Sequence, residues 1–213
     1  LCQSAVDVSI HISIDTSNDG TEAWCESFAA LHSNVTVLPA VGRFGGASRN
    51  FFRLMRDVNF EVYDFIAFAD QDDVWHSDKL KRATEMLRGQ DVDAYSSNVT
   101  AFWSNGRTHL LDKAQAQVEW DYLFEAAGPG CTYVFSHHLA EVLKTSIVEN
   151  WQAVQDVSLH DWYCYAFSRS HGYKWLIDPY SSMQYRQHER NQVGANTGIN
   201  PLIARYKTIH DGW

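Results

Sequence analysis

Paired cysteines, basic residues and long apolar runs are scarce or absent in this 213-residue sequence. Its four cysteines are widely separated and form no C-x-x-C pair, which indicates reduced, mostly buried thiols in a cytosolic protein and argues against a zinc site. Lysine and arginine number 17 against 26 acidic residues, and the formal charge of −9 argues against a protein built to hold nucleic acid. No apolar run approaches the ~20 residues that cross a bilayer, and no signal peptide is visible.

Several common catalytic and phosphate-binding motifs are also missing. The sequence has neither a G-x-G-x-x-G loop nor a G-x-x-x-x-G-K-[ST] loop, so these two glycine-rich phosphate cradles are not indicated. Catalytic-serine and kinase motifs are absent as well. The chain contains no internal repeat and no low-complexity stretch, and it is long enough to bury a full core. We therefore expect a single domain over residues 1–213.

The first ninety residues alternate between strand and helix patterns. Apolar and polar residues alternate from Val8 to Ile14, and short apolar runs follow at 35–38 and 65–68. Apolar residues at helical spacing lie over 24–31, 51–58 and 80–87. This order predicts an α/β fold with a mostly parallel sheet and helices on both faces. The rest is less regular, with extended residues 94–103, an Asn105-Gly106 hairpin turn, strands near 133–135, 173–177 and 183–185, and helices near 139–147 and 159–171.

The run Asp70-Gln71-Asp72-Asp73 is the feature most suggestive of chemistry. It follows an apolar strand, and ligands of open parallel α/β sheets bind beyond the carboxyl ends of the strands. Three carboxylates within four residues repel one another, which is costly unless a cation is near. Their hard oxygen atoms favour magnesium or manganese. The alternative is a solvated turn that leads into a helix capped by Ser77.

Further residues could complete a site, and each has a plainer alternative. Asp15 ends the first strand, where a turn acid is also common. Arg49 opens a helix after glycines and could meet a phosphate or a base edge, or be a surface residue of an ordinary loop. Asp161 opens a later helix, where the helix dipole favours an acid, but it could also be a general base beside the aromatic platform of Trp162. His188 is a third metal ligand or a structural histidine.

Taken together, these motifs resemble the family 2 glycosyltransferases of the GT-A fold, in the branch that includes bacterial rhamnosyltransferases. The D-Q-D-D-x-W run with its downstream K-L is the most specific of them. The set is specific for the family and much less so for the sugar. The segments run in family order over nearly the whole chain: Ile14 to Thr21, Gly45 to Phe51, Phe68 to Trp75 with Asp78-Lys79-Leu80, Gly130-Cys131-Thr132, His160-Asp161-Trp162 and Tyr185 to Gly194.

The resemblance implies a metal-dependent, inverting transfer of a sugar from a nucleotide-diphosphate donor, with Mn²⁺ or Mg²⁺ as cofactor. Asp161 would be the general base that deprotonates the acceptor hydroxyl. Asp72 and His188 would bind the metal, and Gly130 and Trp162 would line the acceptor pocket. Asp15 would contact the nucleobase and Asp70 the ribose. The residues implied in donor binding are Asp15, Arg49, Asn50, Asp70, Gln71, Asp73 and Arg186.

From the same resemblance we expect dTDP-rhamnose as donor and a saccharide or lipid-linked saccharide of cell-surface polysaccharide synthesis as acceptor. Residues 1–92 would form the nucleotide-binding half and 93–213 the acceptor-binding half. The enzyme would act in the cytoplasm, with at most peripheral contact at the inner face of the cell membrane. The family begins with an earlier strand, a polar turn and a helix, of which Leu1 to Ser4 match only the helix end. We therefore expect an N-terminally truncated domain that lacks the first strand, and a longer complete gene product.

Two other functions stay open at this point. A metal-dependent phosphohydrolase could use the same aspartate cluster and would hydrolyse its substrate without any acceptor. A catalytically impaired fragment could bind nucleotide sugars without turnover. The missing first strand favours the second alternative, whereas the retained Asp70, Asp72, Asp161 and His188 argue against it.

Overall fold

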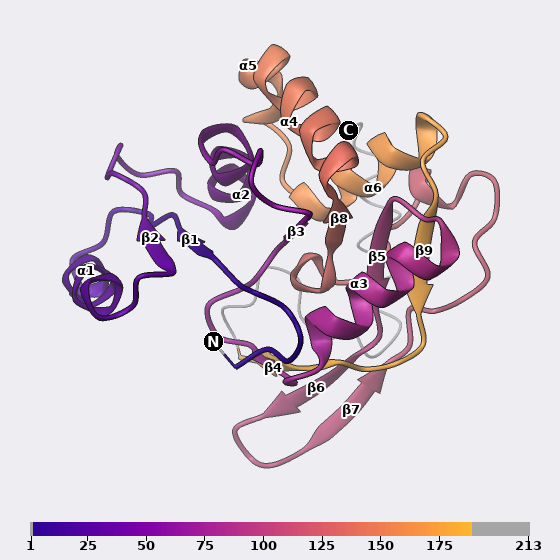
Figure 1. The fold of residues 1–213 in the computed structure, drawn as a ribbon, viewed down its shortest axis with the longest axis horizontal. Coiled ribbons are helices and arrows are strands. Elements are labelled where there is room, and N and C mark those ends of the chain that lie inside the picture. Colours follow the sequence, from indigo (N-terminus) through magenta and orange to yellow (C-terminus); the bar gives the residue numbers. More distant parts are fainter. Residues whose placement is uncertain (1, 189–213) are drawn as a thin grey trace.

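A computed structural model describes residues 2–188 and shows helices packed around three small sheets (Figure 1). The end of the last sequence motif, Glu189 to Gly194, and the polar tail beyond it lie outside the described residues. In chain order the elements are β1 (Ile10–Ile12), α1 (Thr21–Leu31), β2 (Val35–Val37), α2 (Ala47–Asp57), β3 (Phe65–Ala67), β4 (Val74–Trp75), α3 (Lys79–Gln90), β5 (Ala94–Ser97), β6 (Val99–Trp103), β7 (Thr108–Leu111), the 3₁₀ turns η1 (Asp121–Leu123) and η2 (Gly130–Thr132), β8 (Val134–Ser136), α4 (His137–Glu149), α5 (Trp151–Val154), α6 (His160–Ser170), β9 (Trp175–Asp178) and β10 (Met183–Gln187).

The central sheet has the strand order β3–β8–β5–β9. β9 runs parallel to β5, whereas β8 runs antiparallel to both of its neighbours. The predicted α/β class is confirmed, but the expected mostly parallel sheet is a mixed one. The reason is that the N–H of Phe68, just after β3, donates to the carbonyl of Tyr133, just before β8. β8 thus starts where β3 ends and must run back along it.

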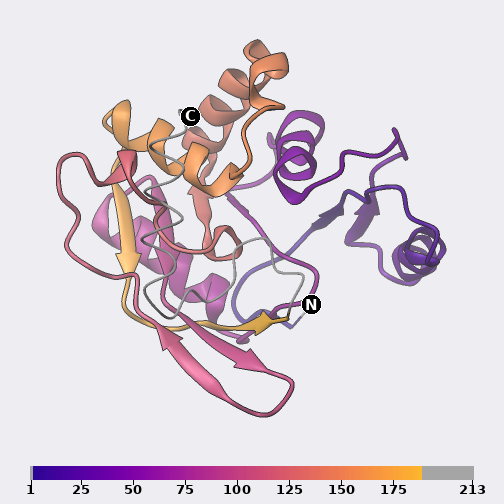
Figure 2. The same ribbon diagram turned by 180° about the vertical axis from the view of Figure 1, so that it is seen from behind.

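Two apolar cores cover opposite faces of this sheet. Neighbouring residues of a strand point to opposite faces. Accordingly Ala94 and Phe135 belong to the core shared with α2, α4 and α6, whereas Tyr95 and Val134 belong to the core under α3. Figure 1 shows α3 in the foreground, and the view from behind in Figure 2 places it at the back. The prediction of helices on both faces is therefore confirmed.

β1 and β2 form a separate parallel pair, with Ile10 opposite Val35. Together with α1 they make the lobe on the left of Figure 1. α1 forms where helical spacing predicts it, but Trp24 and Leu31 remain 63% and 80% exposed, and the Trp24 ring stacks on Phe28. Among the described residues β1 and β2 pair only with each other, so the continuous parallel sheet expected from the first ninety residues is interrupted.

The third sheet, ordered β4–β10–β6–β7, brings distant residues to the end of β3. The predicted hairpin turn at Asn105-Gly106 joins β6 to β7, and Gly106 adopts the left-handed conformation such a turn requires. β10 runs parallel to β6 and antiparallel to β4, with Met183 opposite Trp75. The end of β10 therefore reaches the loop between β3 and β4.

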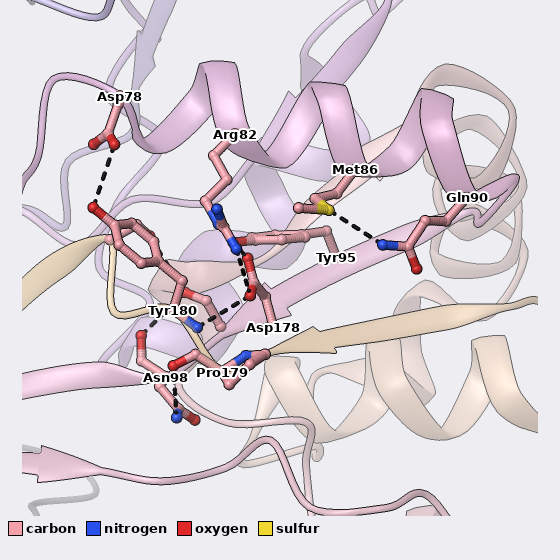
Figure 3. Close-up of polar contacts among 11 residues, drawn as sticks. Asp78, Arg82, Met86, Gln90, Tyr95, Asn98, Asp178, Pro179 and Tyr180 are labelled. Carbon is pink, nitrogen blue, oxygen red and sulfur yellow. Dashed lines mark hydrogen bonds and ion pairs between the residues drawn. The ribbon is translucent and has the colours of Figure 1, made fainter.

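Asp178 holds the corner between β9 and β10 to α3 (Figure 3). Its carboxylate accepts hydrogen bonds from Nε and Nη2 of Arg82 at 2.6 and 3.0 Å and from the hydroxyl of Tyr95 at 2.9 Å. The N–H of Tyr180 donates to the same carboxylate at 3.1 Å. With Asp178 only 3% exposed, these donors satisfy a buried charge and set where β10 begins.

The start of α3 is capped from a distant part of the chain. The predicted cap, Ser77, does not fill this role, because the residue before the helix is Asp78 and its side chain makes no capping bond. Instead the N–H of Leu80 donates to the side-chain oxygen of Gln3, 77 positions away, at 2.9 Å. Gln3 lies in a non-helical segment that runs alongside this helix start.

Two further predictions concern thiols and membranes. Cys25, Cys131 and Cys164 are buried and Cys2 is exposed, and all four thiols are free, as the spacing predicts. Within residues 2–188 no helix combines the length and apolarity needed to span a bilayer.

Candidate active site

Acidic side chains from two distant segments meet at the carboxyl end of β3. The loop 70–73 follows this strand, and Asp161 lies in the first turn of α6. Burial raises the pKa of Asp70 to about 7, helped by repulsion from the other loop carboxylates and from Asp161. The structure thus brings the predicted donor-binding residues Asp70 and Asp73 together with Asp161, the predicted general base.

The Asp161 carboxylate is held by backbone groups at the start of α6. Its Oδ1 accepts the N–H of Trp162 at 2.8 Å. Burial raises the pKa of Asp161, and the N–H groups of Trp162, of Asp161 itself and of Gly130 oppose that rise. The carboxylate is therefore oriented at a helix N-terminus but kept more basic than an exposed aspartate, which suits a group that must accept a proton.

The end of β10 packs against the aspartate loop. Nε2 of His188 lies 2.9 Å from Oδ2 of Asp72. Arg186 donates its backbone N–H to Oδ1 of Asp73 at 2.9 Å and its Nε to the carbonyl of Asp72 at 2.8 Å. These four predicted residues, two from the loop and two from the end of β10 and the position after it, therefore lie together. Gln71 is at the exposed part of the loop.

The pair formed by Asp72 and His188 fits a divalent cation. Two ligands bound about 2.1 Å from one ion at right angles lie roughly 3.0 Å apart, close to the observed 2.9 Å. Carboxylate oxygens such as those of Asp72 are ligands that Mg²⁺ and Mn²⁺ prefer. The same 2.9 Å is also the length of an ordinary hydrogen bond between Asp72 and His188, so the metal site stays a prediction.

A second group of possible ligand atoms lies in the same place. One atom each of Asp70, Asp73 and Cys131 lie within 4.8 Å of one another. Burial raises the pKa of the Cys131 thiol well above its usual value, and the carboxylates of Asp70 and Asp73 raise it further. A protonated thiol is a poor ligand, and hard cations prefer oxygen. The chemistry of the donor set therefore favours the Asp72–His188 pair for the predicted ion.

Gly130 and Trp162, the predicted acceptor-binding residues, border Asp161. Gly130 begins η2, where an added Cβ would lie 3.1 Å from the Cβ of Asp161. Nε1 of Trp162 donates to the carbonyl of Tyr122 at 2.6 Å, which ties the indole to η1. Both residues are thus placed beside Asp161, the predicted general base, by packing and hydrogen bonding.

Three predicted donor residues make their contacts elsewhere. Asp15 accepts hydrogen bonds from the N–H groups of Phe44 and Gly45, and its carboxylate thereby folds the loop before α2 onto the end of β1. Nε of Arg49 donates to the carbonyl of Gln155 at 2.8 Å, and Asn50 donates to the carbonyl of Ser13 at 2.9 Å. A hollow beside Asp15 is lined by Thr16, Ser17, Asn18, Gly42 and Arg43, and its lining includes none of the aspartates of the loop 70–73.

Three residues of the sequence motifs contribute to the site without having been assigned a role. Cys131 lies between Asp70 and Asp73, and the ring of His160 stacks on Phe51 with its Nε2 shielded from solvent. Burial lowers the pKa of His160 to about 3, so its imidazole is neutral. Lys79, at the start of α3, is fully buried. In the sequence, His160 and Lys79 are marked only by an acidic neighbour, and Cys131 only by the motif Gly130-Cys131-Thr132. Neither signal shows that a residue is buried.

Comparison with known proteins decides the family. The family described as "Glycosyltransferase like family 2" matches residues 1–171. A Shigella flexneri protein named dTDP-rhamnosyl transferase RfbG is 48% identical over 212 residues, which cover 99% of this chain and 73% of the relative. The chain is a family 2 glycosyltransferase. The recognition of a rhamnosyltransferase-like member, made from the motifs, is confirmed.

The fold of this glycosyltransferase is also that of solved relatives. The crystal structure of the S. aureus TarS fragment 1-349 matches it with a TM-score of 0.58 at 14% identity, over 84% of this chain. The structure of the same fragment in complex with UDP-GlcNAc matches with a TM-score of 0.57 at 15% identity, over 86% of this chain. The glycosyltransferase spans about half the length of these chains, 51% and 50%. The predicted GT-A fold class is confirmed.

Proposed function

We propose that this glycosyltransferase moves a sugar, with inversion at the anomeric carbon, from a nucleotide-diphosphate donor to a saccharide or lipid-linked acceptor of cell-surface polysaccharide. We take dTDP-rhamnose as the donor, which the name of the Shigella flexneri relative supports. The observation that carries the proposal is the approach of Asp161 to the loop 70–73, because it sets a basic carboxylate next to a candidate diphosphate site. The site of action we propose is cytoplasmic, at the inner face of the cell membrane.

Asp161 is the proton acceptor of this reaction. Its Oδ1 is engaged by the N–H of Trp162, which fixes the carboxylate plane. As the acceptor hydroxyl attacks the anomeric carbon, its proton passes to the carboxylate, and the bond from the sugar to the diphosphate oxygen breaks on the opposite face. General-base catalysis of this kind contributes about 10²–10⁴-fold. Trp162 and the turn at Gly130 border the place where the acceptor would lie.

Asp72 and His188 would hold a Mn²⁺ or Mg²⁺ ion. When bound there, a divalent cation supplies Lewis-acid stabilisation to the leaving nucleoside diphosphate. The chain itself contributes Arg186, whose guanidinium and N–H bind the loop at Asp72 and Asp73 and so keep one cationic side chain beside the donor.

The remaining donor contacts would extend from this loop to the end of β1. Asp70 and Gln71 would face the ribose and diphosphate, and Asp73 would support them from within the loop through its hydrogen bond from Arg186. The nucleobase would lie near Asp15, where the hollow at the end of β1 supports this placement. In this arrangement residues 1–92, joined by Arg186 and His188, would hold the nucleotide, and the rest of residues 93–213 would hold the acceptor. Arg49 and Asn50 would support the donor side from the first turn of α2.

The decisive experiment replaces Asp161 with Asn. We expect sugar transfer to be lost while dTDP binding in the presence of Mn²⁺ stays near that of the wild type. Asp156→Asn, which removes an exposed carboxylate just before α6, is the matched control and should transfer normally. Full transfer by the Asp161 variant would disprove the assignment. Hydrolysis of the nucleotide sugar that needs no acceptor would instead support the phosphohydrolase alternative.

A further inference from the structure

Lys79 is a buried cation behind the aspartate loop. It is the first residue of α3 and is 0% exposed. Its Nζ lies 4.1 Å from the centre of the Trp75 ring and has no hydrogen-bond partner among residues 2–188. A positive charge is unfavourable both in the interior and at the N-terminus of a helix. Something else must therefore compensate for the ammonium at this position.

Asp73 is the group that offers this compensation. Its Oδ1 accepts the N–H of Arg186, whereas its Oδ2 is shielded from solvent and lacks a hydrogen-bond partner within the described part of the chain. The charges of Lys79 and Asp73 act on each other, and Cys131 lies close to both. Nζ of Lys79 and Oδ2 of Asp73 are thus two shielded atoms on groups of opposite charge, neither has a hydrogen-bond partner among residues 2–188, and the Asp73 charge acts on Lys79.

We propose that Lys79 is a positioning residue of the donor site, whose ammonium balances the Asp73 carboxylate and so holds the loop 70–73 in the shape that keeps Asp72 beside His188. This inference rests on the proposed function, because it assigns Lys79 to the nucleotide-binding loop of that site. Trp75 holds the ammonium through its ring face, an attraction that strengthens when water is excluded.

The same arrangement explains why acidic residues can be packed so densely here. The atoms of Asp70, Asp73 and Cys131 lie close enough together to attract a cation. Lys79 supplies a positive charge on that side of the loop at neutral pH, although burial lowers its pKa to about 8. The divalent ion of the proposed reaction is then needed only on the other side, at Asp72 and His188.

The test compares Lys79→Met with Lys81→Met. Methionine keeps most of the length of lysine and removes its charge, and Lys81 is an exposed lysine of the same helix. Binding of dTDP with Mn²⁺ is measured by calorimetry, transfer kinetics give kcat and KM, and Tm reports folding. We expect Lys79→Met to weaken dTDP binding and raise the donor KM by about tenfold, which corresponds to about 1.4 kcal/mol, with a smaller change in kcat. Lys81→Met should change neither.

A second pair of variants separates charge balance from packing. If Lys79 acts through Asp73, the double variant Lys79→Met with Asp73→Asn should bind dTDP no worse than Asp73→Asn alone. A further loss in the double variant, or unchanged dTDP binding in Lys79→Met, would overturn the proposal. If Lys79→Met does not fold, the comparison of Asp73→Asn with the double variant decides alone, and failure of the double variant to fold as well would show a purely structural lysine. A wild-type protein that binds no nucleoside diphosphate would instead contradict the proposed function itself.

Discussion

Gly130 and His160 approach each other so closely that no side chain fits between them. A Cβ on Gly130 would lie 2.8 Å from Nε2 of His160. The imidazole cannot retreat easily, because its ring is stacked on Phe51 with centroids 4.0 Å apart and also borders Phe68. The η2 turn therefore rests directly on the first turn of α6, which carries Asp161. The glycine in this motif is required by packing beside Asp161, the proposed general base.

We predict that Gly130→Ala destabilises the fold by about 1–3 kcal/mol, the usual cost of overpacking, and lowers kcat by moving η2 away from Asp161. Urea unfolding and transfer kinetics measure the two effects. Gly89→Ala is the control, because Gly89 lies in α3 with open space around it and should gain about 0.5–1 kcal/mol. A Gly130→Ala variant with wild-type stability and wild-type kcat would contradict the close packing of Gly130 against His160.

Replacing His188 with Ala should weaken Mn²⁺ binding by more than about tenfold. Losses of about that size occur even when the residue removed only forms a hydrogen bond to a metal ligand. The physical reason is that Asp72 would then offer the ion a carboxylate without the neighbouring imidazole. Titration of Mn²⁺ followed by electron paramagnetic resonance, with dTDP present, measures the change. His109→Ala, at an exposed position of β7, should leave the affinity unchanged. Equal Mn²⁺ affinity in both variants would exclude His188 as a ligand.

The Arg82–Asp178 pair should make stability depend on acid pH. Burial alone would raise the pKa of Asp178, but the hydrogen bonds from Arg82 and its other donors outweigh burial and hold that pKa below the ordinary 3.8. The stabilisation is then complete above pH 3.8 and is lost as the pH falls below that value toward the pKa of the folded state.

Arg82→Met removes the main donor of that carboxylate and should cost about 2–3 kcal/mol near neutral pH, below the usual range for a buried pair because Arg82 is partly exposed. The difference from the wild type should shrink as the pH is lowered below 3.8, since protonated Asp178 no longer needs the arginine. Urea unfolding at several pH values measures it. A difference that stays constant over this range would show that the pair acts only through packing.

Local patterns were enough to predict most of the elements. Helical spacing indicated α2, α3, α4 and α6, and the Asn105-Gly106 turn indicated the β6–β7 hairpin. The placement of carboxylates after the apolar run at 65–68 indicated where the site would lie. These signals depend on residues only a few positions apart, and so they are present in the sequence whatever the rest of the chain does.

Local patterns could not predict the contacts between segments that are distant in the sequence. The sequence did not show that β8 would enter antiparallel between β3 and β5, or that Gln3 would cap α3 in place of Ser77. It did not show that Asp15 would bind the loop before α2 through both of its oxygens. Each of these depends on which surfaces pack together, and packing is not encoded in local periodicity.

Residue identity by itself therefore determined the family, the helices and the acidic motifs of this glycosyltransferase. Only the tertiary structure decided how those motifs are used: Asp161 beside Asp70, His188 against Asp72, and Lys79 buried behind the loop. The physical reason is that charge and hydrogen-bonding capacity belong to single residues. Burial and distance, which set the pKa of Asp70 and the partner of each carboxylate, arise only when segments remote in sequence close around one another.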